Sequence, residues 1–193
     1  MKALIEEFRT AVLATASLAV IVCGLYPLCV WGLGQLLFPY QAGGSLLIHE
    51  GRVVGSSLIG QGFVGPQYFH PRPSAAGDGY DAVASGGSNL GPLSKKLIDS
   101  VGQRVSVYRQ VNAITRDTLV PADAVTTSAS GLDPHISIQN ALLQAPRIAK
   151  TRNISLESVQ KKIYEHTQGR DLLIFGDPRV NVLMLNMSLN RIR

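Results

Sequence analysis

A long uncharged stretch dominates the hydrophobic pattern near the start of the chain. From residue 11 to residue 38 there is no Asp, Glu, Lys or Arg. A helix of about 20 apolar residues crosses the hydrocarbon core of a bilayer, and this stretch is longer than that. The pattern therefore predicts a transmembrane helix over residues 11–38. A short cytoplasmic N-terminus at 1–10 would precede it, and a globular domain at 39–193 would follow.

A cleaved signal peptide is the main alternative for this stretch. Its apolar core would be shorter and would end at a cleavage site of small residues. The residues that follow here, Pro39, Tyr40 and Gln41, do not form such a site. We therefore expect the helix to remain as an anchor.

Three residues inside the anchor have specific consequences. Pro27 lacks a backbone N–H, so it should kink the helix or open a short gap in its hydrogen bonds. Gly24 and Gly32 leave a flat surface on which a second helix could pack closely. A lone anchor needs no such surface, so the glycines favour a partner helix in the membrane.

The charges that flank the anchor predict its orientation. Lys2 and Arg9 precede it, whereas the first basic residue after it is Arg52. Basic residues near a span favour the cytoplasmic side. The bias predicts an N-terminus inside the cell and a globular domain outside the cytoplasm.

The first half of the globular part predicts a hairpin, a long loop and a helix. Residues 46–49 (LLIH) and 52–54 (RVV) flank a Glu-Gly pair, a pattern typical of a β-hairpin. Residues 65–92 are rich in Pro, Gly and Ser and show no period, which indicates a loop. Apolar residues then recur at helical spacing over 93–111. This helix would be capped by Ser88 or Asn89 and would have Pro92 in its first turn.

Two more helices and a strand are expected in the second half. A helix over residues 137–152 would be bent by Pro146. Another would begin after Ser155 and end at Gly169. Residues 180–186 alternate between apolar and other positions and predict a strand. The fold class is therefore an α+β globular domain on a single N-terminal transmembrane helix.

Composition argues against several classes of function. The net charge is +5, but the basic residues are scattered and are not interleaved with aromatic ones, so nucleic-acid binding is not expected. Both cysteines, Cys23 and Cys29, lie within the anchor, so the globular part has no Cys-based zinc site. The histidines show no pair at metal-ligand spacing, and no metal site is expected.

A glycine-rich segment at residues 85–92 could cradle a phosphate with its backbone amides, since a helix is predicted to follow. It lacks the Lys-Ser/Thr pair of a Walker loop and the glycine spacing of a dinucleotide site. A tight turn that leads into a helix cap explains it better. A contact with a nucleotide or a partner stays a hypothesis for Ser85, Gly86, Gly87, Ser88 and Asn89.

Ser130, Asp133 and His135 lie close together in the sequence, as the residues of a catalytic site might. A triad depends on spatial geometry, however, and residues two apart on an extended chain point to opposite sides. We therefore expect Asp133 and His135 to diverge, and Ser137 to cap the next helix. Catalysis is not expected here.

Residues 68–74 mix aromatic residues, Arg and Pro. Tyr68, Phe69 and Arg72 could form an interface hot spot. The same segment could equally be a proline-stiffened loop that packs on its own core. The sequence leaves both interpretations open.

Several strings of the chain resemble the C subunit of the Kdp high-affinity potassium-transporting ATPase. They follow one another in this order behind the single span, and the resemblance covers nearly the whole chain. The strings are GSSLIGQ at 55–61, YFHPRPSA at 68–75, SGGSNLGP at 85–92, ASGLDPHIS at 129–137 and PRVNVLMLN at 178–186. Pro146 is a departure, because a helix-compatible residue would be expected there.

The resemblance implies a non-catalytic accessory subunit of an ATP-driven potassium uptake complex in the bacterial inner membrane, with its domain in the periplasm. Its partners would be a channel-like potassium-binding subunit, a P-type ATPase subunit and a very small membrane peptide. Hydrolysis and phosphorylation would belong to the P-type subunit. The C subunit would support assembly and act as a catalytic chaperone that raises the ATP affinity of that partner. No intrinsic cofactor is implied, and ATP would be involved only together with the partner ATPase subunit.

An external domain cannot touch cytoplasmic ATP, so its effect would have to pass through the membrane as coupling between sites. Two alternatives remain: the domain covers the potassium entrance of the channel-like subunit, or the chain is a free-standing membrane-tethered binding protein. If the chain is a subunit, its candidate partner interface comprises Tyr68, Phe69, Arg72, Ser130, Asp133, His135, Arg179 and Asn181.

Overall fold

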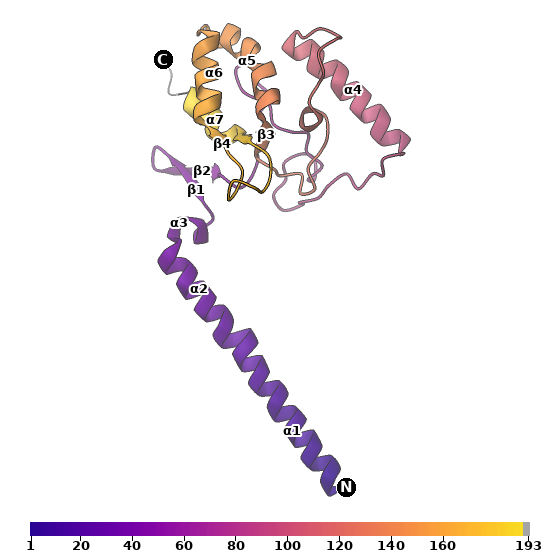
Figure 1. Ribbon diagram of the computed structural model, residues 1–193, viewed down its shortest axis with the longest axis vertical. Coiled ribbons are helices and arrows are strands. Elements are labelled where there is room, and N and C mark those ends of the chain that lie inside the picture. Colours follow the sequence, from indigo (N-terminus) through magenta and orange to yellow (C-terminus); the bar gives the residue numbers. More distant parts are fainter. Residues whose placement is uncertain (191–193) are drawn as a thin grey trace. The chain divides into compact units, whose positions relative to one another are not determined.

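The computed structural model describes residues 1–190, which form two compact units, Met1–Val54 and a second unit from Gly55 onwards (Figure 1). The first unit begins with one long helix, Lys2–Leu37, which by length and composition could cross a membrane. A mixed arrangement of helices and short strands follows in the second unit. The predicted fold class, α+β on a single N-terminal spanning helix, is confirmed.

The long helix passes Pro27 without a break. It consists of α1 (Lys2–Ala19), a π-helical turn η1 (Val20–Leu25) and α2 (Tyr26–Leu37). In the π-helical turn the Tyr26 N–H donates to the carbonyl of Ile21, five residues back. The expected disturbance by Pro27 therefore takes the form of a widened turn directly before it, because the ring leaves one carbonyl without its usual donor.

The predicted hairpin follows the long helix. A single helical turn, α3 (Pro39–Ala42), follows the long helix, and β1 (Leu46–His49) then pairs with β2 (Arg52–Ser56). Glu50 and Gly51 both have positive φ, 50° and 76°. Two central residues of this kind form the tight turn whose twist suits antiparallel strands.

The second unit is built around a small antiparallel sheet with the strand order β3-β5-β4. The strands are β3 (His135–Ser137), β4 (Thr167–Gln168) and β5 (Arg179–Asn181), and Ile136 lies opposite Val180 in the register. Three helices, α5 (Ile138–Arg152), α6 (Leu156–Glu165) and α7 (Val182–Leu189), supply most of the buried side chains. The core contains Phe69, Ile136, Ala141, Ala145, Ile148, Val159, Ile163, Val180, Val182, Leu185 and Leu189.

A polar side chain caps the N-terminus of each of these three helices. Ser137 accepts a hydrogen bond from the Asn140 N–H at the start of α5, and Ser155 accepts one from Ser158 at the start of α6. At α7 the cap is Asn181, whose side chain accepts from the Met184 N–H. The predicted cap at Ser137 is confirmed, and α5 runs to Arg152 as expected, with Pro146 inside it.

Three predicted boundaries are wrong. The strand expected over 180–186 stops at Asn181, because this residue caps α7 and the apolar run that follows is a buried helix. The helix expected from residue 93 is α4 (Lys95–Asn112), with Ser94 as its N-cap rather than Ser88 or Asn89, and Pro92 lies before it. The helix expected to end at Gly169 ends at Glu165, because Thr167 and Gln168 pair with β5.

Candidate functional site

The long loop is held in place near its start by two buried amide side chains. Asn186 of α7 accepts from the Phe69 N–H at 2.8 Å and donates to the Phe69 carbonyl at 3.0 Å. Gln144 of α5 makes the same pair with His70, at 2.7 and 3.1 Å. Each amide thus satisfies a backbone N–H and a backbone carbonyl, which in a sheet would bind a neighbouring strand.

The loop therefore packs on its own core at Phe69, whose side chain is fully buried. Tyr68 lies nearer the surface, where its ring is 5.5 Å from that of Phe63 and 5.3 Å from the Arg152 guanidinium carbon. Any effect of Phe69 on a partner would be indirect. For Tyr68 the interface role stays a prediction.

Arg147, a residue that the sequence analysis did not select, connects α5 to α4 and to the loop. Its Nε donates to Asn112 Oδ1 at 2.9 Å, and one terminal nitrogen donates to Gln144 Oε1 at 2.9 Å. The other donates to the carbonyls of Tyr68, at 3.0 Å, and Pro66. Burial of the Arg147 guanidinium lowers its pKa. Burial of the His70 ring, and then the charge of Arg147, lower the pKa of His70.

A second network starts from Asp123. Its carboxylate accepts from the backbone and hydroxyl of Ser137, at 2.8 and 2.9 Å, and from Asn140 Nδ2 at 2.9 Å. The Tyr108 hydroxyl of α4 donates to Asn140 Oδ1 at 2.8 Å. Burial, and then the charge of Asp123, raise the pKa of Tyr108 far above its usual value, so the phenol stays protonated and available as a donor.

Asp133 meets both Arg72 and His135. Arg72 Nη1 lies 2.9 Å from Asp133 Oδ2, and its other terminal nitrogen donates to the Thr127 carbonyl at 3.3 Å. Asp133 Oδ1 accepts from the His135 N–H at 3.0 Å and lies 3.2 Å from His135 Nδ1. Burial alone would raise the pKa of Asp133, but the hydrogen bonds from His135 and Arg72 outweigh it and lower this pKa.

The expectation that Asp133 and His135 diverge is therefore wrong. The rule of opposite faces holds for an extended strand, and Asp133 lies in the irregular segment before β3. The side chain of Asp133 binds the backbone two residues ahead of it, as Asp commonly does in turns, and this brings the His135 ring back towards its carboxylate.

The glycine-rich segment joins the same region. The Gly86 N–H and the Ser85 hydroxyl both donate to the Ser130 carbonyl, at 2.9 and 3.0 Å. Gly131 has a φ of 68°, and a Cβ on it would lie 2.6 Å from the Gly86 carbonyl oxygen. Three of the strings quoted above thus meet at Gly131, since Ser74 also donates to its carbonyl at 2.7 Å.

This geometry differs from a phosphate cradle. The Gly86 amide already binds Ser130, and the next helix starts only at Lys95, so the segment does not lie at a helix N-terminus. Ser88 and Asn89 are exposed. Their contact with a partner or a nucleotide stays a prediction.

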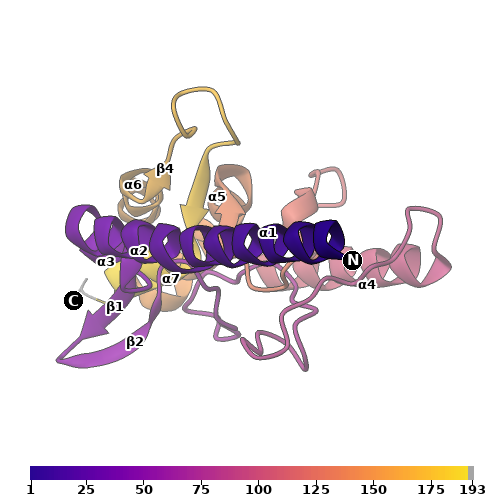
Figure 2. The ribbon, with the colours of Figure 1, turned by 90° about the horizontal axis from the view of Figure 1, so that it is seen from below.

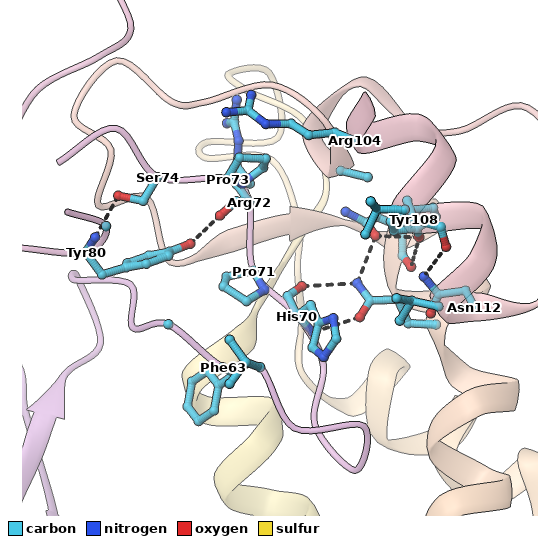
Figure 3. A pocket seen from close by; sticks show the side chains of 18 of the residues that line it. Phe63, His70, Pro71, Arg72, Pro73, Ser74, Tyr80, Arg104, Tyr108 and Asn112 are labelled. Atoms are coloured by element: carbon cyan, nitrogen blue, oxygen red, sulfur yellow. Dashed lines mark hydrogen bonds between the residues drawn. The ribbon is translucent and has the colours of Figure 1, made fainter. Parts of the chain in front are cut away.

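A groove of about 660 Å³ runs between α4 and the loop (Figure 3). Its walls are largely aromatic and aliphatic, with Phe63, Pro71 and Tyr80 from the loop and Val107 and Tyr108 from α4. Figure 3 shows the Tyr80 hydroxyl bonded to the Arg72 carbonyl, which fixes this wall of the groove.

The remaining predicted residues lie in different surroundings. Asn181 is buried, caps α7 and donates to the Ser57 carbonyl at 2.7 Å. Arg179 lies on β5 and pairs with Asp171, 3.0 Å away. Gly24 and Gly32 lie on the long N-terminal helix, where an added Cβ would meet no other atom of this chain within 4 Å.

Nearly all polar groups of the region bind one another, so the arrangement is suited to holding a surface rigid. Within residues 1–190, Arg72 Nε and Arg109 Nε are the buried side-chain atoms without a hydrogen-bond partner. In the same range no group of three or more His, Cys, Asp or Glu could hold a metal ion. The geometry favours a fixed framework for binding.

Comparison with known proteins agrees with the resemblance of the strings. A family model described as the c chain of the K⁺-transporting ATPase, KdpC, matches residues 8–191. A potassium-transporting ATPase KdpC subunit of Mycobacterium tuberculosis is 57% identical over 168 residues, which are 87% of this chain and 89% of the relative. The protein of the same description in Acidobacterium capsulatum is 53% identical over 186 residues, 96% of this chain and 98% of the relative.

Proposed function

Because the chain belongs to the KdpC family of potassium-transporting ATPase subunits, we propose that it is a non-catalytic accessory subunit that supports assembly of the complex. The convergence of the three strings at Gly131 carries this proposal. They form a framework connected by hydrogen bonds, in which Asp133 and His135 serve the fold. A framework of this kind presents a fixed surface to other proteins.

The partners in this proposal are a channel-like potassium-binding subunit, a P-type ATPase subunit and a small membrane peptide. Hydrolysis of ATP takes place on the P-type subunit, and the chain itself needs no cofactor. The long apolar helix and the small residues Gly24 and Gly32 on it support a helix contact with a partner inside the membrane.

The proposal places the anchor in the bacterial inner membrane, with the globular unit on the periplasmic side. In this position the chain raises the ATP affinity of its partner by coupling across the membrane, as a catalytic chaperone, without touching the nucleotide. The hydrogen bond of the Gly86 amide to Ser130 supports this indirect route, because it removes one donor that a phosphate would use.

Purification of the complex through a tag on the P-type subunit tests the proposal. Cells that carry all subunits should yield this chain together with the others, and the KM of the preparation for ATP should rise several-fold when the chain is omitted. A complete complex without the chain, with an unchanged KM, would overturn the proposal. Turnover of ATP by the isolated chain would overturn its non-catalytic part.

A further inference from the structure

The loop between β4 and β5 carries four consecutive apolar side chains into solvent. These residues, here called the apolar tip, are 62 to 90% exposed and comprise Leu172, Leu173, Ile174 and Phe175. Figure 2 shows the loop standing clear of α5 and α6. Single exposed apolar residues are common, but a contiguous run of large ones marks a contact surface.

The base of the loop holds the apolar tip in one conformation. Asp171 and Phe175 exchange two backbone hydrogen bonds, each 2.9 Å long. Arg179 pairs with Asp171 at 3.0 Å, and Arg170 pairs with Asp177 at 3.6 Å. The apolar side chains are thus presented on a closed turn.

The backbone of the apolar tip is also strained. Leu172 and Leu173 have φ values of 51° and 65°, a region that leucine rarely adopts. Glycine or asparagine would relieve this strain, yet two large apolar residues occupy the positions. Strain of this kind is commonly found where a segment has a function to perform.

We propose that the apolar tip inserts into an apolar recess of a partner subunit of the same complex. This inference rests on the assembly role proposed above and assigns one contact to it. It adds a segment, residues 172–175, for which the sequence suggested no role.

The charges around the apolar tip favour a protein recess over a lipid surface. Both arginines at the base are paired with aspartates, so the base carries no net charge that would attract anionic headgroups. A fixed conformation lowers the cost of entering a recess of matching shape. A fluid bilayer offers no shape to match.

Co-purification of a double variant tests this contact. Leu173→Ser with Ile174→Ser, made in the full chain and expressed with all partners, should lower the recovery of the chain on the tagged P-type subunit at least tenfold. Val83→Ser with Leu119→Ser is the matched control, since both residues are also exposed, at 98 and 80%, and its recovery should stay unchanged. Both variants should unfold at the wild-type temperature, because their side chains touch solvent.

The outcomes separate this inference from the proposed function. If the wild-type chain and the tip variant are recovered equally well, the contact is refuted and the assembly role stands. If the wild-type chain itself is not recovered with its partners, both are refuted.

Insertion into lipid is tested separately. In a Trp31→Phe background, Phe175→Trp places the only tryptophan of the chain at the apolar tip. We expect no fluorescence quenching by brominated acyl chains when the full chain is reconstituted alone. Strong quenching would overturn the protein recess in favour of the bilayer.

Discussion

At the scale of single residues, Asp133 connects two other residues of the candidate interface, Arg72 and His135. Its two carboxylate oxygens bind the Arg72 guanidinium and both the backbone and the ring of His135. Through Arg72, which also binds the Thr127 carbonyl, the carboxylate connects the long loop to the segment before β3. The sequence placed all three residues in one candidate interface. It did not predict their mutual contact, because strand alternation takes no account of a side chain that binds the backbone two residues ahead, as Asp133 does.

Substitution of this carboxylate should change both the stability and its pH dependence. We expect Asp133→Asn to lower the free energy of unfolding by about 1–2 kcal/mol at pH 7, because the half-buried Arg72 loses its charged partner. The pKa of Asp133 is lowered by folding. Its contribution is therefore present above the pKa of the unfolded chain and is lost as the pH falls below about 4.

Thermal unfolding of the full chain in detergent between pH 7 and pH 3 measures this effect. The difference between wild type and Asp133→Asn should shrink towards the acid end. A difference that stays constant over the whole range would show that the charge of Asp133 does not stabilise the fold.

At the scale of elements, α7 is the helix that the hydrophobic pattern did not predict. Residues 182–189 are apolar on nearly all sides because the helix is buried, so neither helical nor strand periodicity stands out. The cap at Asn181 was the available signal, since Asn favours the position before a helix. By contrast, α5 and α6 have one apolar face each and a serine cap, and the sequence placed their starts correctly.

The side-chain amide of Asn186 should contribute strongly to the stability of the fold. We expect Asn186→Leu to lower the free energy of unfolding by about 2–4 kcal/mol, because the buried N–H and carbonyl of Phe69 lose their partners. Met184→Leu on the same helix is the control, since Met184 is exposed. Denaturant unfolding of the full chain measures both. Equal values for the two variants would contradict the role assigned to the amide.

At the scale of the whole molecule, the chain combines an anchor that the sequence predicts well with a domain that it predicts only in part. A long uncharged run has few structural explanations, so the single helix followed directly from composition. The long loop is different. Its path depends on contacts between residues more than 70 positions apart, such as His70 with Gln144, and no local pattern encodes these.

The proposed orientation of the anchor makes a prediction for the whole chain. With Lys2 and Arg9 inside the cell, trypsin added to sealed right-side-out vesicles should cut the globular unit at exposed basic residues such as Arg116 and Arg170. A tag on the N-terminus should remain protected. Cleavage that requires inside-out vesicles would reverse the orientation.

The two buried amides have a consequence for how such a protein can change over time. Asn186 and Gln144 bind Phe69 and His70 only through their backbone N–H and carbonyl groups. Every amino acid except proline has both groups. Mutations can therefore exchange the outward-facing side chains of the loop while the route of its backbone stays the same. In a subunit built in this way, surface residues of the loop can change along with the sequence of a partner while the buried core stays the same.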